Sequence, residues 1–442
     1  MLKQVQHDCR RTLRRGLQVA ARPPPYFYLC LLSRAAMGST GQMTVCVDRS
    51  GASPARLEAV PAGVGADVFV HRAHDVVDTL AAEWTALARS ASEPNVFAEH
   101  WFVAASLRTL GAGRDIRLLE VRRASRLIGL LLVTVERGYA RLSVRHVRNW
   151  LHDQMFLGTP LVAAGEEAAF WAAAIAALDE ADWAPGLLHL TSLTEGGPLH
   201  RALPGDTAFR EVRAFLHSDL DATAYYEAAV RQKKRKEIRR LRNRLAETGA
   251  IEAHILADPA ALAGWCDIYL ALERAGWKGR QGSALACRPE TERFFRETLA
   301  AAQAAGRLQF LRLDAGGKPI AMLVNFLAAP GSFSFKTVFD EDFARFSPGV
   351  LIQLENLANI LSHESIRWMD SCAVEDHPMI DGLWMERRGI VRVTVRLKGA
   401  RRALIFASCR ALERGSAGAR RLARYCAERV ARRRSPPNAP PK

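Results

Sequence analysis

The fold is decided by the stretch Val121-Arg-Arg-Ala-Ser-Arg-Leu-Ile-Gly-Leu-Leu-Leu-Val133, which reads as two apolar strands joined by a short polar turn. A second stretch, Leu313-Asp-Ala-Gly-Gly-Lys-Pro-Ile-Ala-Met-Leu-Val-Asn325, aligns with it without a gap at a spacing of 192 residues. Few positions are identical, but the same order of helices and strands surrounds both stretches. The sequence therefore predicts an α/β protein with two mixed domains rather than one large sheet.

Working outward from these stretches gives the two blocks. In the first block we expect helices over 75–91, 99–110 and 166–178, and strands over 116–121, 126–135 and 187–193. In the second block we expect helices over 258–275, 289–304 and 350–361, and strands over 308–313, 319–327, 332–339 and 366–369. The predicted boundaries are a leader over 1–65, domains over 66–210 and 211–396, and a basic helical tail over 397–442.

The net charge of +16 lies in the two ends of the chain. Residues 1–40 contribute +6 and residues 396–442 contribute +12, whereas the 355 residues between them carry −2. The body is therefore nearly neutral, which makes nucleic acid an unexpected partner for it. The charge of the tail leaves two interpretations open. Residues 399–434 associate weakly with anionic membrane in a salt-sensitive way, or they form a solvated end that packs only locally.

The leader and the cysteines suggest a cytoplasmic protein, peripheral at most to the inner face of the membrane. Residues 1–40 are rich in arginine and poor in acids, which suits a transit peptide, but Met37 or Met43 as the true start explains them as well. Eight cysteines are scattered without zinc-ligand spacing, which favours reduced thiols and no metal. No run of about 20 apolar residues indicates a membrane-spanning helix.

Between the two blocks, residues 222–247 read as one long helix with Val230, Ile238, Leu241 and Leu245 on one face. Nine Lys or Arg residues and one Glu fall within 231–244. Two interpretations stay open: a solvated helix face, or a surface for an anionic substrate or donor.

The second block contains a series of phrases in order: Glu273-Arg-Ala-Gly-Trp-Lys-Gly279, Lys336-Thr-Val-Phe-Asp340, Arg345-Phe-Ser-Pro-Gly349, Asp370, His377-Pro378 and Leu383-Trp-Met-Glu-Arg-Arg388. This series resembles the CelD/FemAB-like branch of the GNAT superfamily, also called BioF-like acetyltransferases. The resemblance covers roughly 215–395 and is thinner over 67–210. It implies two tandem GNAT-like domains with mixed sheets flanked by helices, and transfer of an acyl group to an amine or hydroxyl.

Acyl transfer from a thioester needs a pyrophosphate site, stabilisation of an oxyanion and a proton acceptor. The start of a helix that follows a strand suits pyrophosphate, which predicts Phe346, Ser347, Pro348 and Gly349 as residues that bind coenzyme A. Ser347 and Pro348 also suit the first turn of any helix, whereas Gly349 is explained by close approach of the backbone to a ligand. The resemblance implies acetyl-CoA or another acyl-CoA as co-substrate. The family's usual phosphate-binding loop has more glycines than this one, so the loop alone does not identify the donor.

The other candidate residues come from strand ends and a helix end. If strand 332–339 alternates, Lys336 lies opposite Phe335 and contacts phosphate or carboxylate, or it simply pairs with Asp340. Glu273 opposes the dipole of its helix, which suggests a partner such as substrate or Lys278. Trp277 and Lys278 are the candidate substrate-binding residues, with Trp277 either lining a pocket or capping the core. The catalytic candidates are Asp340, Glu273, and two more near a strand end, Asp370 and His377.

The resemblance, taken together with these residues, implies three candidate functions. The first is an acyl-CoA-dependent transferase that acts on an amine or hydroxyl of an envelope or exopolysaccharide-related acceptor, a small molecule or glycan precursor. The second is a FemAB-like aminoacyl-tRNA-dependent transferase, for which the basic segment 231–244 would hold RNA. The third is a non-catalytic GNAT-fold subunit of a polysaccharide-assembly complex.

Overall fold

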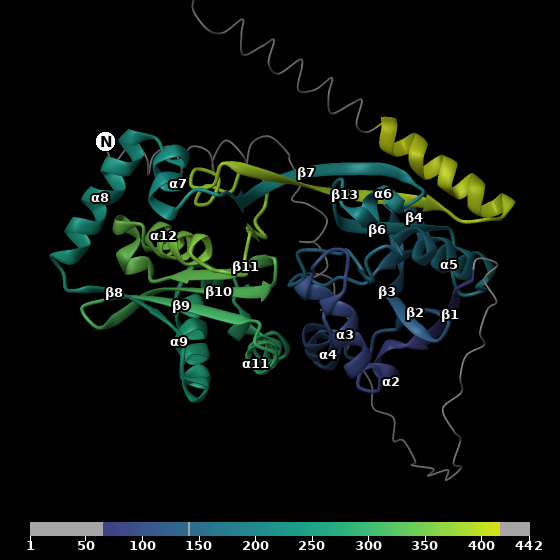
Figure 1. The fold of residues 1–442 in the computed structure, drawn as a ribbon, viewed down its shortest axis with the longest axis horizontal. Helices are drawn as coiled ribbons and strands as arrows, with labels where there is room; N and C mark the ends of the chain where they lie inside the picture. Colours follow the sequence, from purple (N-terminus) through teal and green to yellow (C-terminus); the bar gives the residue numbers. More distant parts are fainter. Residues whose placement is uncertain (1–64, 140–141, 416–442) are drawn as a thin grey trace, which may run out of the picture. The chain divides into compact units, whose positions relative to one another are not determined.

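The computed structural model of the chain describes residues 65–139 and 142–415 (Figure 1). The expectations for the leader and for the tail beyond Gly415 lie outside the described residues. Within them, residues 400–415 form a helix, as predicted for the start of the tail. No helix in these ranges has the length and apolar composition needed to cross a membrane.

The elements follow one another as the two blocks predicted, with several additional strands. The first half contains β1 (Asp67–Arg72), α2 (Ala73–Val76), α3 (Ala81–Arg89), η2 (Val96–Ala98), α4 (His100–Thr109), β2 (Ile116–Arg123), β3 (Arg126–Tyr139), β4 (Leu142–Asn149), β5 (Leu161–Val162), α5 (Glu167–Glu180), β6 (Leu187–Thr194), α6 (Pro198–Ala202) and β7 (Asp206–His217). The second half contains α7 (Ala222–Ala229), α8 (Gln232–Ala246), β8 (Ile251–Ile255), η3 (Pro259–Ala261), α9 (Leu262–Ala275), α10 (Trp277–Arg280), η4 (Leu285–Cys287), α11 (Pro289–Ala304), β9 (Leu308–Ala315), β10 (Lys318–Ala328), β11 (Gly331–Phe339), η5 (Glu341–Phe346), α12 (Pro348–Leu361), β12 (Trp368–Asp370) and β13 (Glu386–Arg396).

The two halves repeat the same strand pairing. β1, β2, β3 and β4 pair antiparallel in sequence order and β4 pairs parallel with β6. β8, β9, β10 and β11 do the same, and β11 pairs parallel with β12. The hairpins at the 192-residue spacing turn at Ala124–Ser125 and Gly316–Gly317, where all four residues have positive φ, as a two-residue hairpin turn requires. The predicted mixed α/β class and internal repeat are confirmed.

The expectation of two separate sheets was wrong, because hydrogen bonding joins all strands into one sheet of order β1-β2-β3-β4-β6-β13-β7-β12-β11-β10-β9-β8, with β5 beside β3. The last strand of each half is exchanged: β13 pairs with β6 of the first half, and β7 pairs with β12 of the second. These two long strands also pair with each other along most of their length (Figure 1). Exchange removes an edge from each half-sheet, which is why the two sheets merge.

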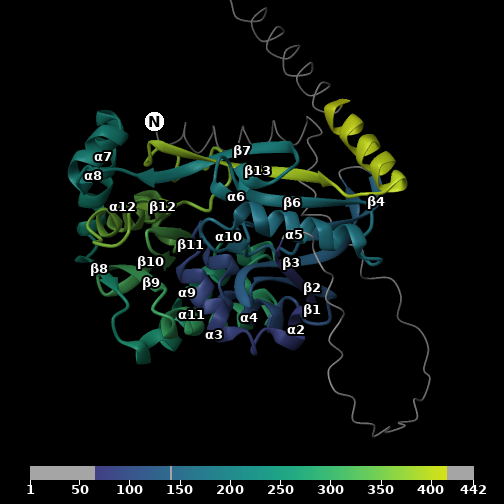
Figure 2. The same ribbon diagram turned by 45° about the vertical axis from the view of Figure 1, so that its right-hand side comes forward.

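Helices cover both faces of the sheet. One core lies under α3, α4, α9 and α11, contains buried side chains from both halves, and includes the edge-to-face contact of Phe102 with Phe294 at 5.6 Å (Figure 2). On the other face, α5 covers the first half, and α7, α8 and α12 cover the second half. The predicted stripe of the first helix, which the structure divides into α2 and α3, is buried there through Val77, Leu80, Trp84 and Leu87.

The predicted helix over 222–247 is interrupted. Asp221 accepts hydrogen bonds from the backbone N–H groups of Thr223 and Ala224 and so starts α7, which ends at Ala229. Val230 is extended, with φ −108° and ψ 118°, and it is buried in the core beneath the sheet. Because β-branched residues such as Val230 favour extended backbone conformations, the chain leaves the helix at this position and α7 and α8 are separate helices.

Candidate functional site

The open edge of β11 is the first feature of the site. β12 pairs with β11 only from Gly331 to Phe333, because β12 ends at Asp370. From residue 334 to Phe339, the side of β11 that faces away from β10 has no strand partner among the described residues. Such an edge presents backbone N–H and C=O groups to an extended ligand that contains amides.

A β-bulge decides which way Lys336 points. The register between β10 and β11 shifts between Val324 and Asn325, so that Ser334 lies opposite Asn325 and Lys336 lies opposite Val324. Phe335 is the extra residue. The expected alternation was therefore wrong: the bulge places Lys336 on the same face of the sheet as Phe335, whereas Phe339 packs on the α12 face.

Lys336 is a half-buried ammonium beside two aromatic rings. Its Nζ atom lies 5.2 Å from the centre of the Phe335 ring and 6.0 Å from that of Phe156. Burial and, to a smaller extent, the nearby Lys278 ammonium lower the pKa of Lys336 to about 8, while the carboxylates of Glu273 and Asp153 oppose the shift. Among the described residues, Lys336 makes no hydrogen bond or ion pair. A cation that is withdrawn from water without a protein partner is poised for an anionic group on a ligand.

Glu273 has the partner that its position at the end of α9 suggested. The buried carboxylate accepts a hydrogen bond from Lys278 Nζ at 2.7 Å and another from the Leu285 N–H at 2.7 Å. A hollow lies beside this pair, between the end of α9, α10 and β11. Its lining consists of Leu272, Glu273, Gly276, Trp277, Lys278, Thr337, Val338, Phe339 and Glu341. The predicted pocket residues Glu273, Trp277 and Lys278 thus converge next to Lys336.

The start of α12 differs from the expected helix cap. Ser347 adopts the left-handed conformation, with φ 55° and ψ 53°, and its side chain makes no capping hydrogen bond. A non-glycine residue in this conformation is strained and is often found at functional sites. Phe346 and Pro348 are buried. Gly349 is also buried, and a Cβ atom there would lie 2.7 Å from the Met379 sulfur. Packing against Met379 is therefore a second reason for glycine at this position, and the donor-binding role suggested for Gly349 stays a prediction.

Replacing Gly349 with alanine tests this packing. Alanine is favoured over glycine in a helix by about 1 kcal/mol, but its Cβ must displace Met379. We expect Gly349→Ala to lower the free energy of unfolding in the natural background and to raise it in a Met379→Ala background, with a coupling on the order of 1 kcal/mol. Denaturant unfolding of the four proteins in this cycle measures the coupling. Additive effects would show that Met379 does not restrict this position.

Asp340 and Asp370 are each held by other protein groups. Asp340 pairs with Lys318 at 2.7 Å, not with Lys336, and it accepts the N–H of Asp342 at the start of η5. Asp370 is fully buried between Arg213 and Arg388, with N–O distances of 2.7 and 2.9 Å. Burial alone would raise the pKa of Asp370, but the two guanidinium groups outweigh it and hold this pKa below its usual value.

His377 lies in the loop after β12, two residues from Met379 and therefore near the start of α12. The ring is half-buried and burial lowers its pKa, which the neighbouring Asp381 carboxylate opposes. Its Nδ1 atom is buried without a hydrogen-bond partner in the described ranges. The catalytic roles suggested for Asp340, Asp370 and His377 stay predictions.

The equivalent strand edge in the first half is closed by the chain itself. β4 and β6 also separate after a short parallel pairing, at Val147 and Arg148. Beyond it, the Asn149 amide donates to the carbonyls of Gly158 and Thr191 at 3.0 and 2.9 Å, and the Gly158 N–H donates to Ser192 O at 2.7 Å. The loop over 150–160 therefore fills the space that stays open beside β11. Only the second half presents a candidate site of this kind within the described residues.

A row of basic side chains on α8 lies near the start of α12. α8 packs against η5, which precedes α12 directly. An open hollow on α8 is lined by Lys236, Arg239, Arg240, Asn243, Arg244 and Glu247. Of the nine cations in 231–244, three form ion pairs: Arg235 with Glu227, Arg240 with Glu237 and Arg242 with Glu355. Lys234 donates a hydrogen bond to the Gly382 carbonyl. The others leave a positively charged surface beside the helix start where pyrophosphate was predicted.

Sequence reasoning missed two kinds of site residue. Thr337, Phe339 and Glu341 line the hollow because β11 runs past it, and the local motif around Lys336 could have suggested them. Glu341 also accepts the Trp277 N–H at 2.6 Å and pairs with Arg280 at 2.7 Å. Phe156 comes from the first half, 180 residues before Lys336, and no local pattern pointed to it. No group of metal-binding side chains was found within the described residues.

Comparison with known proteins finds a family similarity within the second half. Residues 232–377 match the family model of the acetyltransferase (GNAT) domain. This part of the chain is similar to a GNAT domain, which confirms the resemblance noted in the sequence and supports a transferase fold. The matched range contains the hollow, Lys336 and α8, so the candidate site lies inside the domain. No curated protein matches the chain.

Three solved structures show low similarity to the chain. The crystal structure of FemX has 10% identity and a TM-score of 0.46, with 70% of this chain and 96% of that chain covered. The tandem GNAT protein from the clavulanic acid biosynthesis pathway has 18% identity and a TM-score of 0.40, with coverage of 75% and 98%. The C-terminal domain of a putative lysylphosphatidylglycerol synthetase from Agrobacterium fabrum has 12% identity and a TM-score of 0.46, with coverage of 76% and 96%.

Proposed function

We propose that this protein is an acyltransferase that moves an acetyl or other acyl group from coenzyme A to an amine or hydroxyl of an envelope or exopolysaccharide-related acceptor. The observation that carries the proposal is the unpartnered Lys336 ammonium beside the open edge of β11. The edge suits the amides of a pantetheine arm, and the ammonium suits an oxygen that becomes negative during the reaction.

The proposed reaction is direct transfer. The lone pair of the acceptor attacks the thioester carbonyl carbon, the carbonyl oxygen takes the negative charge, and collapse of this intermediate breaks the C–S bond. The departing thiolate is protonated to the free thiol, and the acceptor loses one proton. Lys336 faces the developing oxyanion in this scheme. Glu273, the buried carboxylate of the hollow, accepts the proton, and Lys278 holds it in place.

The basic surface of α8 is proposed to bind the anionic end of the donor, with the pyrophosphate at the start of α12. The same surface is the observation that favours the second candidate function, transfer from an aminoacyl-tRNA, since a row of exposed cations also suits a polyphosphate chain. Inward-facing polar groups in the hollow support an enzyme more than a non-catalytic subunit.

A ligand screen tests the proposal and separates these donors. At 100 times its Kd, a true donor stabilises the protein by about 2.7 kcal/mol, so acetyl-CoA or a longer acyl-CoA is expected to raise the melting temperature, and release of free thiol should follow when an acceptor is added. Changing Lys236, Arg239, Arg240 and Arg244 to glutamine should weaken donor binding several-fold at low salt and less at high salt.

The matched control changes Arg288 and Arg293, exposed residues at the start of α11, to glutamine and should leave donor binding unchanged. Stabilisation by aminoacyl-tRNA and by none of the thioesters would replace the leading proposal with the second one. Stabilisation by neither donor would contradict both enzymatic functions.

A further inference from the structure

A loop of the first half reaches the candidate site of the second half. This is the loop over 150–160 that closes the first half's own strand edge. Its Phe156 ring lies 5.9 Å from the Phe335 ring and 5.6 Å from the Phe97 ring, both nearly edge-to-face. The same ring lies 6.0 Å from Lys336 Nζ. One side of the Lys336 ammonium therefore borders a residue that does not belong to the GNAT domain match.

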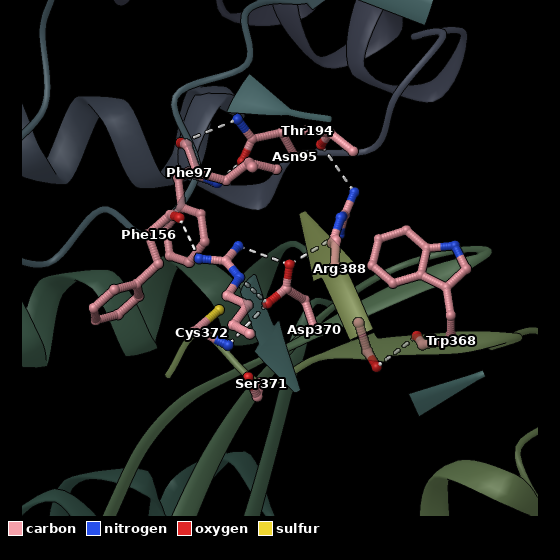
Figure 3. Close-up of polar contacts among 12 residues, drawn as sticks. Asn95, Phe97, Phe156, Thr194, Trp368, Asp370, Ser371, Cys372 and Arg388 are labelled. Atoms are coloured by element: carbon pink, nitrogen blue, oxygen red, sulfur yellow. Dashed lines mark hydrogen bonds and ion pairs between the residues drawn. The ribbon is translucent and has the colours of Figure 1, made fainter. Parts of the chain in front are cut away.

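Phe156 is held in place by a buried ionic cluster, part of which is drawn in Figure 3. Its carbonyl oxygen accepts a hydrogen bond from Arg213 Nη1 at 2.8 Å. The Arg213 guanidinium, which is 4% exposed, is bound in turn to Asp370. Asp370 also accepts hydrogen bonds from Arg388 Nη1 and from the Cys372 N–H, each at 2.9 Å (Figure 3).

The cluster sits where the exchanged strands meet. Arg213 is on β7, Arg388 is on β13 and Asp370 is on β12, so three strands from both halves meet at one carboxylate. Arg388 also donates to Thr194 Oγ1 of β6 at 3.0 Å and stacks over the Trp368 ring at 4.9 Å. A buried ion-paired cluster of this kind fixes geometry more than it adds stability. The backbone of Phe156 is thereby fixed relative to the sheet that carries Lys336.

The position of Phe156 has a direct consequence for the cation. Phe156 and Phe335 both border the ammonium, so water that would otherwise solvate it is excluded on these sides, and the ring faces favour a cation at this distance. Loss of the Phe156 ring would admit water next to Nζ and free the side chain to take other rotamers.

We propose that Phe156 is a positioning residue for Lys336: the first half supplies the ring, and the Arg213–Asp370–Arg388 cluster holds it, so that the ammonium stays dehydrated and aimed at the open edge of β11. The transfer site is therefore composite. The proposal rests on the proposed function for its catalytic consequence, but the position and ionisation of Lys336 are measurable without any substrate.

The test is an NMR titration of the full chain labelled with lysine carrying ¹³C at Cε. The Lys336 signal is identified by its absence in Lys336→Arg. In the natural protein we expect this signal to titrate near a pKa of about 8. In Phe156→Ala we expect the pKa to rise toward the ordinary lysine value of about 10.4. Phe156→Leu, which keeps an apolar cover, should stay close to the natural protein, as should Phe209→Ala, which removes an exposed ring from β7.

Activity provides the second readout. In Phe156→Ala, kcat should fall on the order of 10-fold to 100-fold with little change in the KM for donor, and the alkaline limb of the pH profile should move to higher pH. An unchanged Lys336 titration in folded Phe156→Ala overturns the proposal, as does an equal shift in Phe209→Ala. If the natural protein transfers no acyl group, the proposed function fails, while the titration still decides the role of Phe156.

Discussion

Replacing Lys336 with methionine is expected to lower kcat/KM for acyl transfer on the order of 10²-fold to 10³-fold, the usual loss when one group that stabilises an oxyanion is removed. Methionine keeps the apolar stem of the side chain among Phe335 and Phe156 but removes the charge. Because the ammonium is half-buried and makes no ion pair with another described residue, its removal should leave the free energy of unfolding unchanged or raise it. Steady-state kinetics and denaturant unfolding of the same variant measure the two effects.

The pH dependence of kcat provides a second test of the role of Lys336. Burial lowers the pKa of Lys336 to about 8, so the ammonium is present below that pH and is lost above it. If the cation stabilises the oxyanion, kcat should fall as the pH rises through about 8, and Lys336→Met should lose this alkaline limb. Lys398→Met, at a position where the side chain is 78% exposed, serves as the control and should retain full activity. Full activity in Lys336→Met would contradict the assignment.

Asp370→Asn is expected to lower the free energy of unfolding by about 3–5 kcal/mol, the loss seen when one partner of a buried ion pair is removed. The substitution leaves Arg213 and Arg388 facing each other in the interior, at the point where β7, β12 and β13 meet. Since the exchanged strands join both halves there, the loss should affect the whole described sheet. Asp115→Asn, which removes a half-exposed surface pair with Arg117, should cost less than about 1 kcal/mol.

Lowering the pH should cause part of the same loss in the free energy of unfolding. The folded pKa of Asp370 is lower than its ordinary value, since Arg213 and Arg388 outweigh the effect of burial. The resulting stability is present above the ordinary pKa and is lost as the pH falls through it toward the lower folded value. The natural protein should therefore lose stability over this acidic range more steeply than Asp370→Asn does. Parallel pH profiles, or a loss below 1 kcal/mol at neutral pH, would contradict the structural role of the cluster.

The repeated fold was predictable because its signals are local. The two hairpins at the 192-residue spacing and the apolar stripe of the first helix arise from patterns within short windows of sequence. Exchange of β7 and β13 was not predictable in this way. Each strand pairs with partners from the other half, and nothing in the segments over 206–217 or 386–396 says which edge they will join.

The site was predictable to a similar extent. Glu273, Trp277 and Lys278 lie within one short segment, and their convergence near β11 followed from the motif. The direction of Lys336 depends on a one-residue bulge, which reverses every later side chain of the strand, and simple alternation cannot reveal it. The close contact of Gly349 with Met379 could not be predicted, because Met379 lies 30 residues further along the chain. Phe156 could only be found from tertiary structure.

The claim that the open edge of β11 binds the donor is tested most directly by hydrogen–deuterium exchange of the full chain with and without saturating acetyl-CoA. The account predicts slower exchange in peptides that cover residues 334–349, since backbone N–H groups of the edge and of the α12 start would be occupied. Peptides over 142–160, where Asn149 and Gly158 already close the equivalent edge, should be unchanged. Saturable binding of acetyl-CoA with protection in 142–160 and none in 334–349 would contradict the account.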